Sequence, residues 1–379
     1  MTERRIDIAS PVTGDEEWTA LRGSLESGWL TQGPRVAEFE RLFAEYQGVP
    51  YAKAVTSCTT GMHLALRALG IGPGDEVIVP AFTWVATANV VIYCGATPVF
   101  VDVDPVTYNL DPTKLVDALS DRTKAVMAVH LFGLCADIDA IRAVVPDDVD
   151  IVEDAACAIG ASYRGRPAGG LGRLGVFSFH PRKVITTGEG GMVTTAEEEL
   201  AEVVEALRNH GASLPEEVRH VGSQPWLLPD FDLLGYNYRM TDLQGSVGIA
   251  QMARLDGLLA ERRHWAEWYS KALGEVAWLR PPVVPEGYVH GWQSYVVVVD
   301  ESAPAPRNEL MEQLHRQGVS TRPGTHAVPD LGWYRRELGT SMEAYPAATW
   351  LRDRSMAIPL HNRMDDHDFE RVVDALISL

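Results

Sequence analysis

Short runs of β-branched and other apolar residues recur through the first two thirds of the chain, each separated from the next by a segment of helical pattern. The four clearest runs are residues 76–79, 98–103, 125–129 and 150–153. Because their apolar character is continuous rather than alternating, they suit strands that are covered on both faces. The covering helices are expected at residues 60–69, 86–93 and 138–144. The sequence therefore predicts an α/β domain built on a mainly parallel sheet.

The last third of the chain follows a different pattern. Residues 243–273 form a long helical stretch rich in Ala, Leu, Glu and Arg, and an apolar strand-like run follows at 294–299. The final segment, 366–379, has the pattern of an amphipathic closing helix. We therefore expect a large domain over residues 1–255 and a smaller C-terminal α+β domain over residues 256–379.

Charge and composition exclude several classes of partner. The chain has 33 Lys and Arg residues against 52 Asp and Glu residues, a net charge of −19. Such a surface repels nucleic acid and anionic lipid, although a few local cations can still hold an anionic small substrate. We expect neither a nucleic-acid nor a membrane role, and no secretory signal or bilayer-spanning segment is visible.

Cysteine and histidine usage gives two further expectations. The four cysteines are scattered, which suits reduced thiols in a cytoplasmic protein. The eleven histidines show no metal-ligand spacing, so no metal site is predicted.

The densest chemical signal is the segment 177–191. A strand-like run leads to Lys183 in a turn, and a Gly-rich stretch follows that allows close backbone packing. A deprotonated lysine can form an imine with an aldehyde. Taken alone, a lysine is more often a solvated surface charge.

Three further features gain meaning beside Lys183. Asp154 follows a predicted strand, where ligands of open α/β sheets bind, and its carboxylate could keep a pyridine nitrogen protonated or simply cap a helix. The hydroxyl-rich segment 56–61 could bind phosphate at a helix N-terminus, although capping alone also explains it. Trp84 could stack on a flat heterocycle, although core packing is the commoner role of a tryptophan.

In order and spacing these motifs resemble those of the DegT/StrS family, the sugar aminotransferases among the fold type I enzymes that use pyridoxal 5′-phosphate (PLP). The resemblance covers nearly the whole chain. Its matching stretches are 28–34, 57–63, 82–89, 153–156, 177–191, 235–242 and Pro359-Leu360. It implies the PLP-dependent transferase fold of type I, a large domain with a mainly parallel mixed sheet plus a smaller C-terminal domain.

The resemblance also implies roles for individual residues. Lys183 would form the Schiff base with PLP and move the proton between the substrate carbon and the cofactor. Asp154 would partner the pyridinium nitrogen, and Trp84 would stack on the ring. The phosphate ligands from the same subunit would be Thr59, Thr60 and Ser178.

Other implied roles concern the second subunit, the substrate and one departure from the family pattern. Asn237 would reach the phosphate of a partner subunit, so the resemblance implies a homodimer with shared active sites. His326, Arg239 and Thr31 would line the substrate cleft. Cys157 stands where the family often has Gln or His, and its thiol is only a weak donor for the phenolic oxygen of PLP.

The function implied by the resemblance is transfer of an amino group from glutamate or glutamine to a keto-sugar, typically a nucleotide-linked 3- or 4-keto-deoxysugar. Two alternatives stay open: an acceptor such as an inosose or another specialised-metabolite ketone, and a non-catalytic regulator with a PLP fold. Relatives that dehydrate their substrates carry histidine in place of the lysine, so Lys183 favours transamination.

Overall fold

The computed structural model describes residues 4–213, 226 and 228–379, and its centre is a seven-stranded sheet. The strands lie in the order β1 (Tyr51–Val55), β10 (Gly191–Thr195), β9 (Leu174–Ser178), β6 (Asp150–Asp154), β5 (Thr123–Val129), β2 (Glu76–Pro80) and β4 (Thr97–Val101). From β9 to β4 neighbouring strands are parallel, whereas β10 runs antiparallel to both β1 and β9. The predicted α/β class with a mainly parallel sheet is confirmed.

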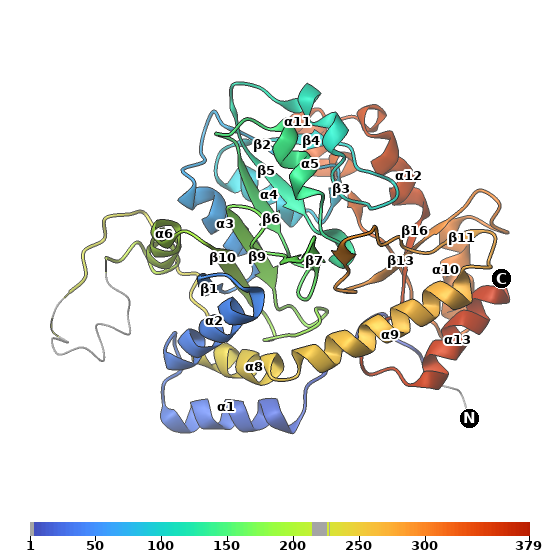
Figure 1. Cartoon of the computed structure of the whole chain (residues 1–379), viewed down its shortest axis with the longest axis horizontal. Helices are drawn as coiled ribbons and strands as arrows, with labels where there is room; N and C mark the ends of the chain where they lie inside the picture. The colour runs from blue at the N-terminus through green and yellow to red at the C-terminus, as the bar shows by residue number, and fades with distance from the viewer. Residues whose placement is uncertain (1–3, 214–225, 227) are drawn as a thin grey trace.

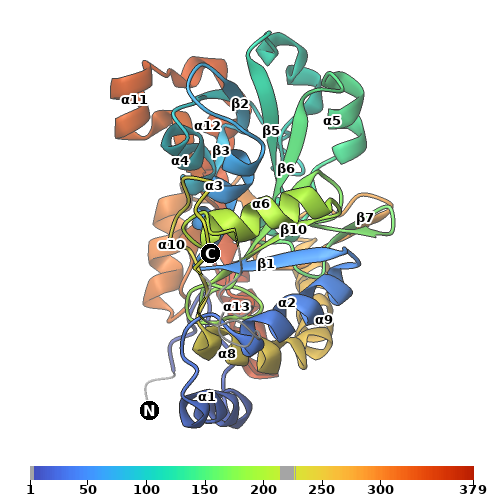
Figure 2. The same cartoon turned by 90° about the vertical axis from the view of Figure 1, so that its left-hand side faces the viewer.

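Both faces of the sheet are covered, as continuous apolar strands require. Along β5, Met127 packs into the core on one face, while Val126 and Ala128 pack into the core on the other. The first face carries α3 (Cys58–Ala68), α4 (Ala86–Tyr93) and α6 (Glu198–Arg208), and the second carries α2 (Pro34–Gln47) and α5 (Ile138–Val144). Figure 2 shows α6 and α2 on opposite sides of β1.

The expected long helical stretch at 243–273 is in fact two helices. α8 (Asp242–Met252) ends and α9 (Leu255–Leu273) begins after a short turn at Ala253 and Arg254. Arg254 donates a hydrogen bond to the carbonyl of Val12 at 3.0 Å and pairs with Glu17 of α1 (Asp15–Ser27), which directs its side chain toward α1 at the turn. In Figure 1, α8 lies against α1 and α2, and α9 runs from there to the C-terminal elements.

The C-terminal elements form a second layer of sheet and helices. A four-stranded sheet has the order β11 (Leu279–Arg280), β13 (Tyr295–Val299), β16 (Ser355–Ile358) and β14 (Arg322–Pro323). Its core includes residues of α9, α10 (Arg307–Arg316) and α13 (Asp366–Ile377). Ile6 also packs there, and its backbone N–H donates to the Gly318 carbonyl at 2.8 Å. The domain boundary at residue 255 stays a prediction.

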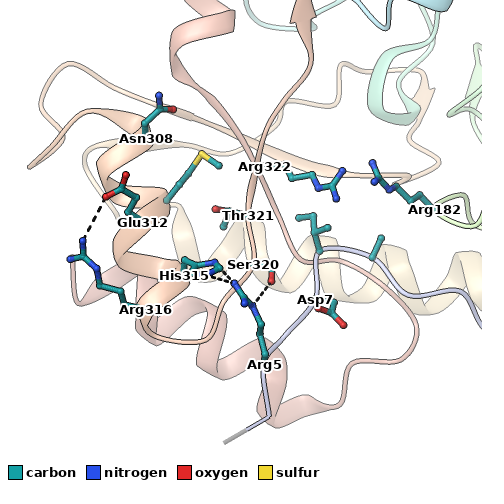
Figure 3. Close-up of a pocket in the computed structure, with 13 residues that line it drawn as sticks. Arg5, Asp7, Arg182, Asn308, Glu312, His315, Arg316, Ser320, Thr321 and Arg322 are labelled. Carbon is teal, nitrogen blue, oxygen red and sulfur yellow. Dashed lines mark hydrogen bonds and ion pairs between the residues drawn. The ribbon is translucent and has the colours of Figure 1, made fainter.

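Two features of the C-terminal elements bear on the site. A short strand, β15 (His326–Ala327), pairs antiparallel with β3 (Phe82–Thr83) of the large sheet region, so the C-terminal chain returns to the end of β2. A cavity of about 760 Å³ opens between the N-terminal segment, α10 and the residues around β14 (Figure 3). The remaining elements are β7 (Ser162–Tyr163), β8 (Arg166–Pro167), β12 (Tyr288–Val289), α11 (Gly332–Leu338) and α12 (Pro346–Arg354). Among the described helices, none is both long and apolar enough to cross a bilayer.

Candidate functional site

The expected site residues gather where the central parallel strands end. Asp154 is the last residue of β6, and Ser178 is the last residue of the adjacent β9. Lys183 lies in the turn after β9, and Trp84 follows β3. The carboxyl edge of a parallel sheet is where open α/β folds bind ligands. The topology therefore brings four residues that are scattered along the sequence to one edge.

The carboxylate of Asp154 is buried and is held by neutral hydrogen-bond donors. Its exposed fraction is 5%, and it accepts hydrogen bonds from the Thr87 hydroxyl at 2.7 Å and from the Ala156 N–H at 3.2 Å. In the described part of the chain, no Lys, Arg or His side chain forms an ion pair with it. Burying an unpaired carboxylate is costly, so this site suits a ligand that brings its own positive charge. A protonated pyridine nitrogen is such a group.

The amine of Lys183 points to Cys157. Its Nζ donates a hydrogen bond to the Cys157 Sγ at 3.1 Å, and the side chain is half-buried. Burial acts to lower the pKa of Lys183, but the sulfur atoms of Cys157 and Cys58 and the charge of Asp154 outweigh burial and raise that pKa. The surrounding residues alone therefore hold Lys183 in its charged form, whereas attack on an aldehyde needs the neutral amine.

Trp84 and His326 meet although they lie far apart in the sequence. His326 pairs with Thr83 across β15 and β3, and the two rings lie 5.5 Å apart between centroids at an angle of 49°. The indole of Trp84 is 59% exposed, so a broad aromatic surface faces outward beside the carboxyl ends of the strands. A flat heterocycle could stack on that surface.

The start of α3 combines capping with a free hydroxyl. Ser57 Oγ accepts from the Thr60 N–H at 3.1 Å and Thr60 Oγ1 accepts from the Ser57 N–H at 3.0 Å, so these two residues form a capping box. The Thr59 hydroxyl makes no hydrogen bond to any residue that the structure describes. Gly191 allows β10 to approach this helix start, because a Cβ there would lie 2.5 Å from the Ser57 backbone. The helix start is thus both capped and suited to phosphate.

Three other predicted site residues, Asn237, Arg239 and Thr31, form no hydrogen bond with Lys183 in the described chain. Asn237 is exposed, and Arg239 donates from Nη1 to the Asn209 Oδ1 at 2.7 Å. Thr31 is exposed, and its carbonyl accepts from the Asp242 N–H at 3.0 Å. Their roles stay predictions. Ser178, in contrast, lies at the predicted edge, where its Oγ accepts from the His180 N–H at 3.4 Å.

Two contacts at the site were not anticipated. Thr87 holds Asp154, and its only sequence signal was its place in the matching stretch 82–89. Gln293 holds the backbone on both sides of Lys183: its Oε1 accepts from the Val184 N–H at 3.1 Å, and its Nε2 donates to the Arg182 carbonyl at 2.6 Å. Nothing in the sequence around Gln293 indicates this role.

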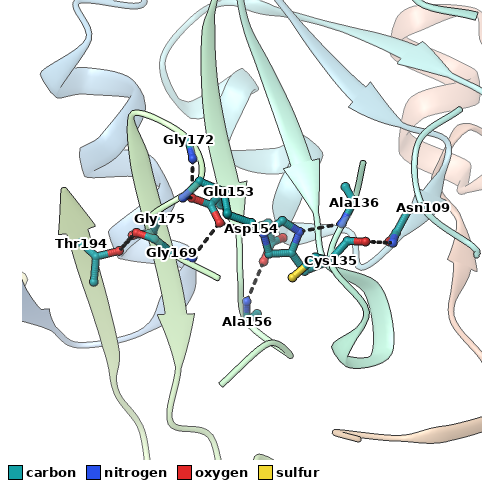
Figure 4. A network of polar contacts seen from close by, with 12 residues as sticks. Asn109, Cys135, Ala136, Glu153, Asp154, Ala156, Gly169, Gly172, Gly175 and Thr194 are labelled. Atoms are coloured by element: carbon teal, nitrogen blue, oxygen red, sulfur yellow. Dashed lines mark hydrogen bonds and ion pairs between the residues drawn. The ribbon is translucent and has the colours of Figure 1, made fainter. Parts of the chain in front are cut away.

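A buried polar network fixes the strand that carries Asp154. Glu153 accepts hydrogen bonds at 2.6 Å from the N–H groups of Gly169 and Gly172, whose backbone faces it in Figure 4. His130 Nδ1 accepts from the Ala136 N–H at 3.0 Å, so the proton of the neutral ring is on Nε2, which donates to Glu153 at 2.8 Å. Because both carboxylate oxygens are satisfied, the end of β6 is held in one position.

Over residues 4–213, 226 and 228–379, no cluster of three or more His, Cys, Asp or Glu side chains could hold a metal ion.

Comparison with known proteins gives consistent matches over the whole chain. A family model described as the DegT/DnrJ/EryC1/StrS aminotransferase family matches residues 11–377. The chain is 39% identical to the spore coat polysaccharide biosynthesis protein SpsC of Bacillus subtilis over 375 residues, which cover 98% of this chain and 96% of that protein. It is 38% identical to GDP-perosamine synthase of Caulobacter vibrioides over 376 residues, covering 98% and 97% of the two chains.

A solved structure extends the comparison to three dimensions. The Streptococcus pneumoniae protein Spr1654 in its PMP form superposes with a TM-score of 0.93 at 29% identity, covering 98% of each chain. Its PLP form superposes with a TM-score of 0.92 at 29% identity, covering 99% of this chain and 98% of that one.

Proposed function

The chain belongs to the DegT/DnrJ/EryC1/StrS aminotransferase family, and we propose that it transfers the amino group of glutamate or glutamine to a nucleotide-linked keto-sugar. It is a PLP-dependent aminotransferase, and its relatives include sugar aminotransferases. The observation that carries the proposal is the buried carboxylate of Asp154, which forms no ion pair within the described chain, near the amine of Lys183. A non-catalytic regulator would have no use for that pair, because an unpaired buried carboxylate only destabilises a fold.

The residues present fit PLP. Lys183 would hold the cofactor aldehyde, Asp154 would face the ring nitrogen and Trp84 the ring. The phosphate would be bound at the start of α3 by Thr59 and by Ser178. When bound, PLP supplies an electron sink that lowers the cost of removing a proton from the substrate carbon.

Lys183 would then act as the base and acid of the reaction. As a neutral amine, the Lys183 side chain would take a proton from the substrate carbon and would later donate that proton back. Asp154 would keep the ring nitrogen of bound PLP protonated, and Thr87 holds Asp154 in place through its 2.7 Å hydrogen bond. Cys157 lies 3.1 Å from the amine and sets its resting position.

The acceptor class rests on the relatives. One of them is named as GDP-perosamine synthase and another as a protein of polysaccharide biosynthesis. We therefore propose a nucleotide-linked 3- or 4-keto-deoxysugar as the acceptor, with inososes and other cyclic ketones as the alternatives to be screened.

We further propose a homodimer with shared active sites. Asn237 is exposed, which suits a residue that reaches a second subunit. Three large apolar side chains in the same region of the sequence are exposed as well: Leu228 and Leu234 at 85% and Phe231 at 57%. Exposed apolar residues of this size favour burial against another chain.

The test of the function is an absorbance spectrum of the protein reconstituted with PLP. We expect a band near the visible edge that shifts when L-glutamate or L-glutamine is added, and borohydride reduction should fix the cofactor on Lys183. A Lys183→Ala variant should keep its fold and lose the band and the turnover. A reconstituted wild-type protein that shows neither band nor shift would contradict the aminotransferase assignment.

A screen of acceptors follows from a positive spectrum. The protein that has taken up the amino group from the donor is mixed with nucleotide-linked keto-sugars and, separately, with inososes. Return of the original absorbance spectrum then reports transfer of the amino group to the acceptor. Return with an inosose and with no nucleotide-linked sugar would overturn the proposed acceptor class while leaving the aminotransferase assignment intact.

A further inference from the structure

The cavity of about 760 Å³, whose lining includes Arg182, the residue that precedes Lys183, is large enough for a small-molecule substrate. Its polar walls come from three parts of the chain: Arg5 and Asp7 of the N-terminal segment, Glu312 and His315 of α10, and the pair Arg182 and Arg322. A smaller cavity of about 150 Å³ shares both arginines of this pair and includes Gln293. The two arginines therefore stand where the two cavities meet.

The side chains of Arg182 and Arg322 point toward one another in Figure 3. Burial, together with the positive charge of Arg322, lowers the pKa of Arg182. Neither guanidinium makes a hydrogen bond or an ion pair with any residue the structure describes. The chain carries 52 acidic residues, yet none of the described ones neutralises this pair.

Other cations on the same cavity are already engaged. Arg5 donates to the Ser320 Oγ at 3.1 Å and contacts His315, and Arg316 pairs with Glu312 at 3.6 Å. Both side chains are exposed, so solvent weakens the repulsion between the two like charges, and an oxyanion bound between them would remove the repulsion that is left. Guanidinium groups also match the geometry of carboxylate and phosphate oxygens, to which they donate in pairs.

The arginine pair is connected to the reaction site through the backbone. Arg182 directly precedes Lys183, and Gln293 holds its carbonyl and the Val184 N–H. Arg322 lies in β14, four residues before His326, whose ring lies against Trp84. One arginine thus belongs to the segment that carries Lys183, and the other to the small sheet. An anion held between them would lie beside the site and contact both parts of the molecule.

We propose that Arg182 and Arg322 form an oxyanion-binding subsite that takes a phosphate or carboxylate group of a substrate at the mouth of this cavity. The source of the oxyanion rests on the proposed function: it is either a phosphate of the nucleotide-linked acceptor or the distal carboxylate of the amino donor. The subsite itself rests on the unpaired arginines and the cavity.

Direct binding to the PLP-loaded enzyme tests the subsite without catalysis. Inorganic pyrophosphate and glutarate, which stand for the two kinds of oxyanion, are titrated separately by calorimetry. We expect at least one of them to bind, with an affinity that falls at least about tenfold in Arg182→Gln and in Arg322→Gln and that weakens with rising salt. Arg336→Gln, which removes an exposed arginine of α11, is the control for net charge and should leave binding unchanged. Failure of both probes to bind, or equal binding in all variants, would overturn the subsite.

Kinetics of the same variants identify the source. If the donor supplies the oxyanion, Arg182→Gln and Arg322→Gln raise the L-glutamate concentration needed for the half-maximal spectral shift about tenfold and affect L-glutamine less, because glutamine lacks the second carboxylate. If the acceptor supplies it, the shift with both donors is unchanged and the KM for a nucleotide-linked acceptor rises about tenfold. Loss of the spectral shift in the wild-type protein would instead contradict the proposed function, and calorimetry would still decide the subsite.

Discussion

The carboxylate of Asp154 depends on a hydroxyl group 67 residues away. Thr87 donates to it at 2.7 Å, and a second hydroxyl, that of Thr83, lies 3.2 Å from the Thr87 Oγ1. A hydrogen bond to a charged acceptor contributes about 1.5–3 kcal/mol, and about 1.4 kcal/mol corresponds to a factor of ten in rate. Replacing the Thr87 hydroxyl by a methyl group should therefore disturb the position of Asp154 relative to a ring nitrogen.

We expect Thr87→Val to lower kcat by about tenfold, because valine keeps the volume and removes the donor to Asp154. Asp154→Asn, which removes the charge itself, should cost more of the turnover than Thr87→Val does. Both values come from steady-state kinetics with a saturating donor. Thr83→Val is the matched control, since it removes a hydroxyl that does not touch Asp154, and its effect should be small. Equal rates in Thr87→Val and wild type would show that Thr87 does not orient the carboxylate.

Cys157 contacts the amine of Lys183 and acts to raise the pKa of that lysine. The sulfur contributes more than any other residue to the raised pKa of the lysine, in opposition to burial. A raised pKa means that the neutral amine, which attacks the PLP aldehyde, becomes scarcer as the pH falls below that pKa.

The expected consequence is a shift in the pH profile of cofactor attachment. In Cys157→Ala the pKa of Lys183 should fall, so the rate at which apoprotein takes up PLP should reach its plateau at a lower pH than in wild type. Stopped-flow absorbance across a pH series measures this. Cys94→Ala removes a buried thiol elsewhere and should leave the profile in place. A profile that moves to higher pH in Cys157→Ala would contradict the role given to the sulfur.

At the scale of elements, the two residues Trp292 and Gln293, just before β13, connect α9 to the turn that carries Lys183. Arg262 of α9 is buried and donates from Nη1 to the carbonyls of Trp292 and Leu360 at 3.0 and 2.8 Å. Burial lowers the pKa of Arg262 to about 10, so it stays charged near neutral pH. Gln293, which follows Trp292, forms hydrogen bonds with the backbone on both sides of Lys183. The orientation of α9 is thereby coupled to the position of the lysine.

Gln293→Leu should lower turnover by about tenfold while leaving the protein folded. Leucine has a similar size but leaves the buried Val184 N–H without its acceptor, and an unsatisfied buried group costs about 1–3 kcal/mol. A role in positioning Lys183 predicts more than lost stability: the absorbance band of the bound cofactor and the pH profile of kcat should both move. Gln317→Leu, at an exposed site after α10, is the control. If the variant is less stable but its cofactor absorbance band and its pH profile of kcat are unchanged, Gln293 contributes to stability and does not position Lys183.

At the scale of the whole molecule, the prediction still to be tested is an active site shared between the two subunits of a homodimer. Homodimeric enzymes with a two-fold axis contain two equivalent sites, each able to draw residues from both chains. No hydrogen bond joins Asn237 to Lys183 within the described chain, and Asn237 is exposed. An exposed Asn237 suits the proposed role at the cofactor of a partner subunit.

Mixed dimers test this directly. A Lys183→Ala chain paired with an Asn237→Ala chain contains one intact site if Asn237 acts across the interface, and it should recover up to about half of the wild-type activity. A Lys183→Ala chain paired with an Asp154→Ala chain should recover none, because both residues act within one chain. Differently tagged chains are co-expressed, and the mixed species is purified and assayed. The same activity in the two mixtures would contradict a shared site.

Local patterns in the sequence predicted the central strands and the residues that these strands carry, but they did not predict elements such as α1, α2 and α6. The apolar runs at 76–79 and 125–129 lie within β2 and β5, because the side-chain pattern of a buried strand is a property of neighbouring residues. Asp154, expected just after the run 150–153, is the last residue of β6. The motif around Lys183 likewise lies within one segment. The prediction of one long helix failed at the turn between α8 and α9, where a contact of Arg254 with distant Glu17 accompanies the change of direction. The predicted run 98–103 also extends two residues beyond the end of β4.

The tertiary structure decided which residues meet. Thr87 reaches Asp154 because β2 and β6 both flank β5, and His326 reaches Trp84 because β15 adds to β3. Gln293 clamps a turn that lies 109 residues earlier in the chain. Such contacts depend on strand order and on how the C-terminal elements pack against the large sheet. No local pattern encodes them, since their partners are separated by long stretches whose own side chains carry no trace of the pairing.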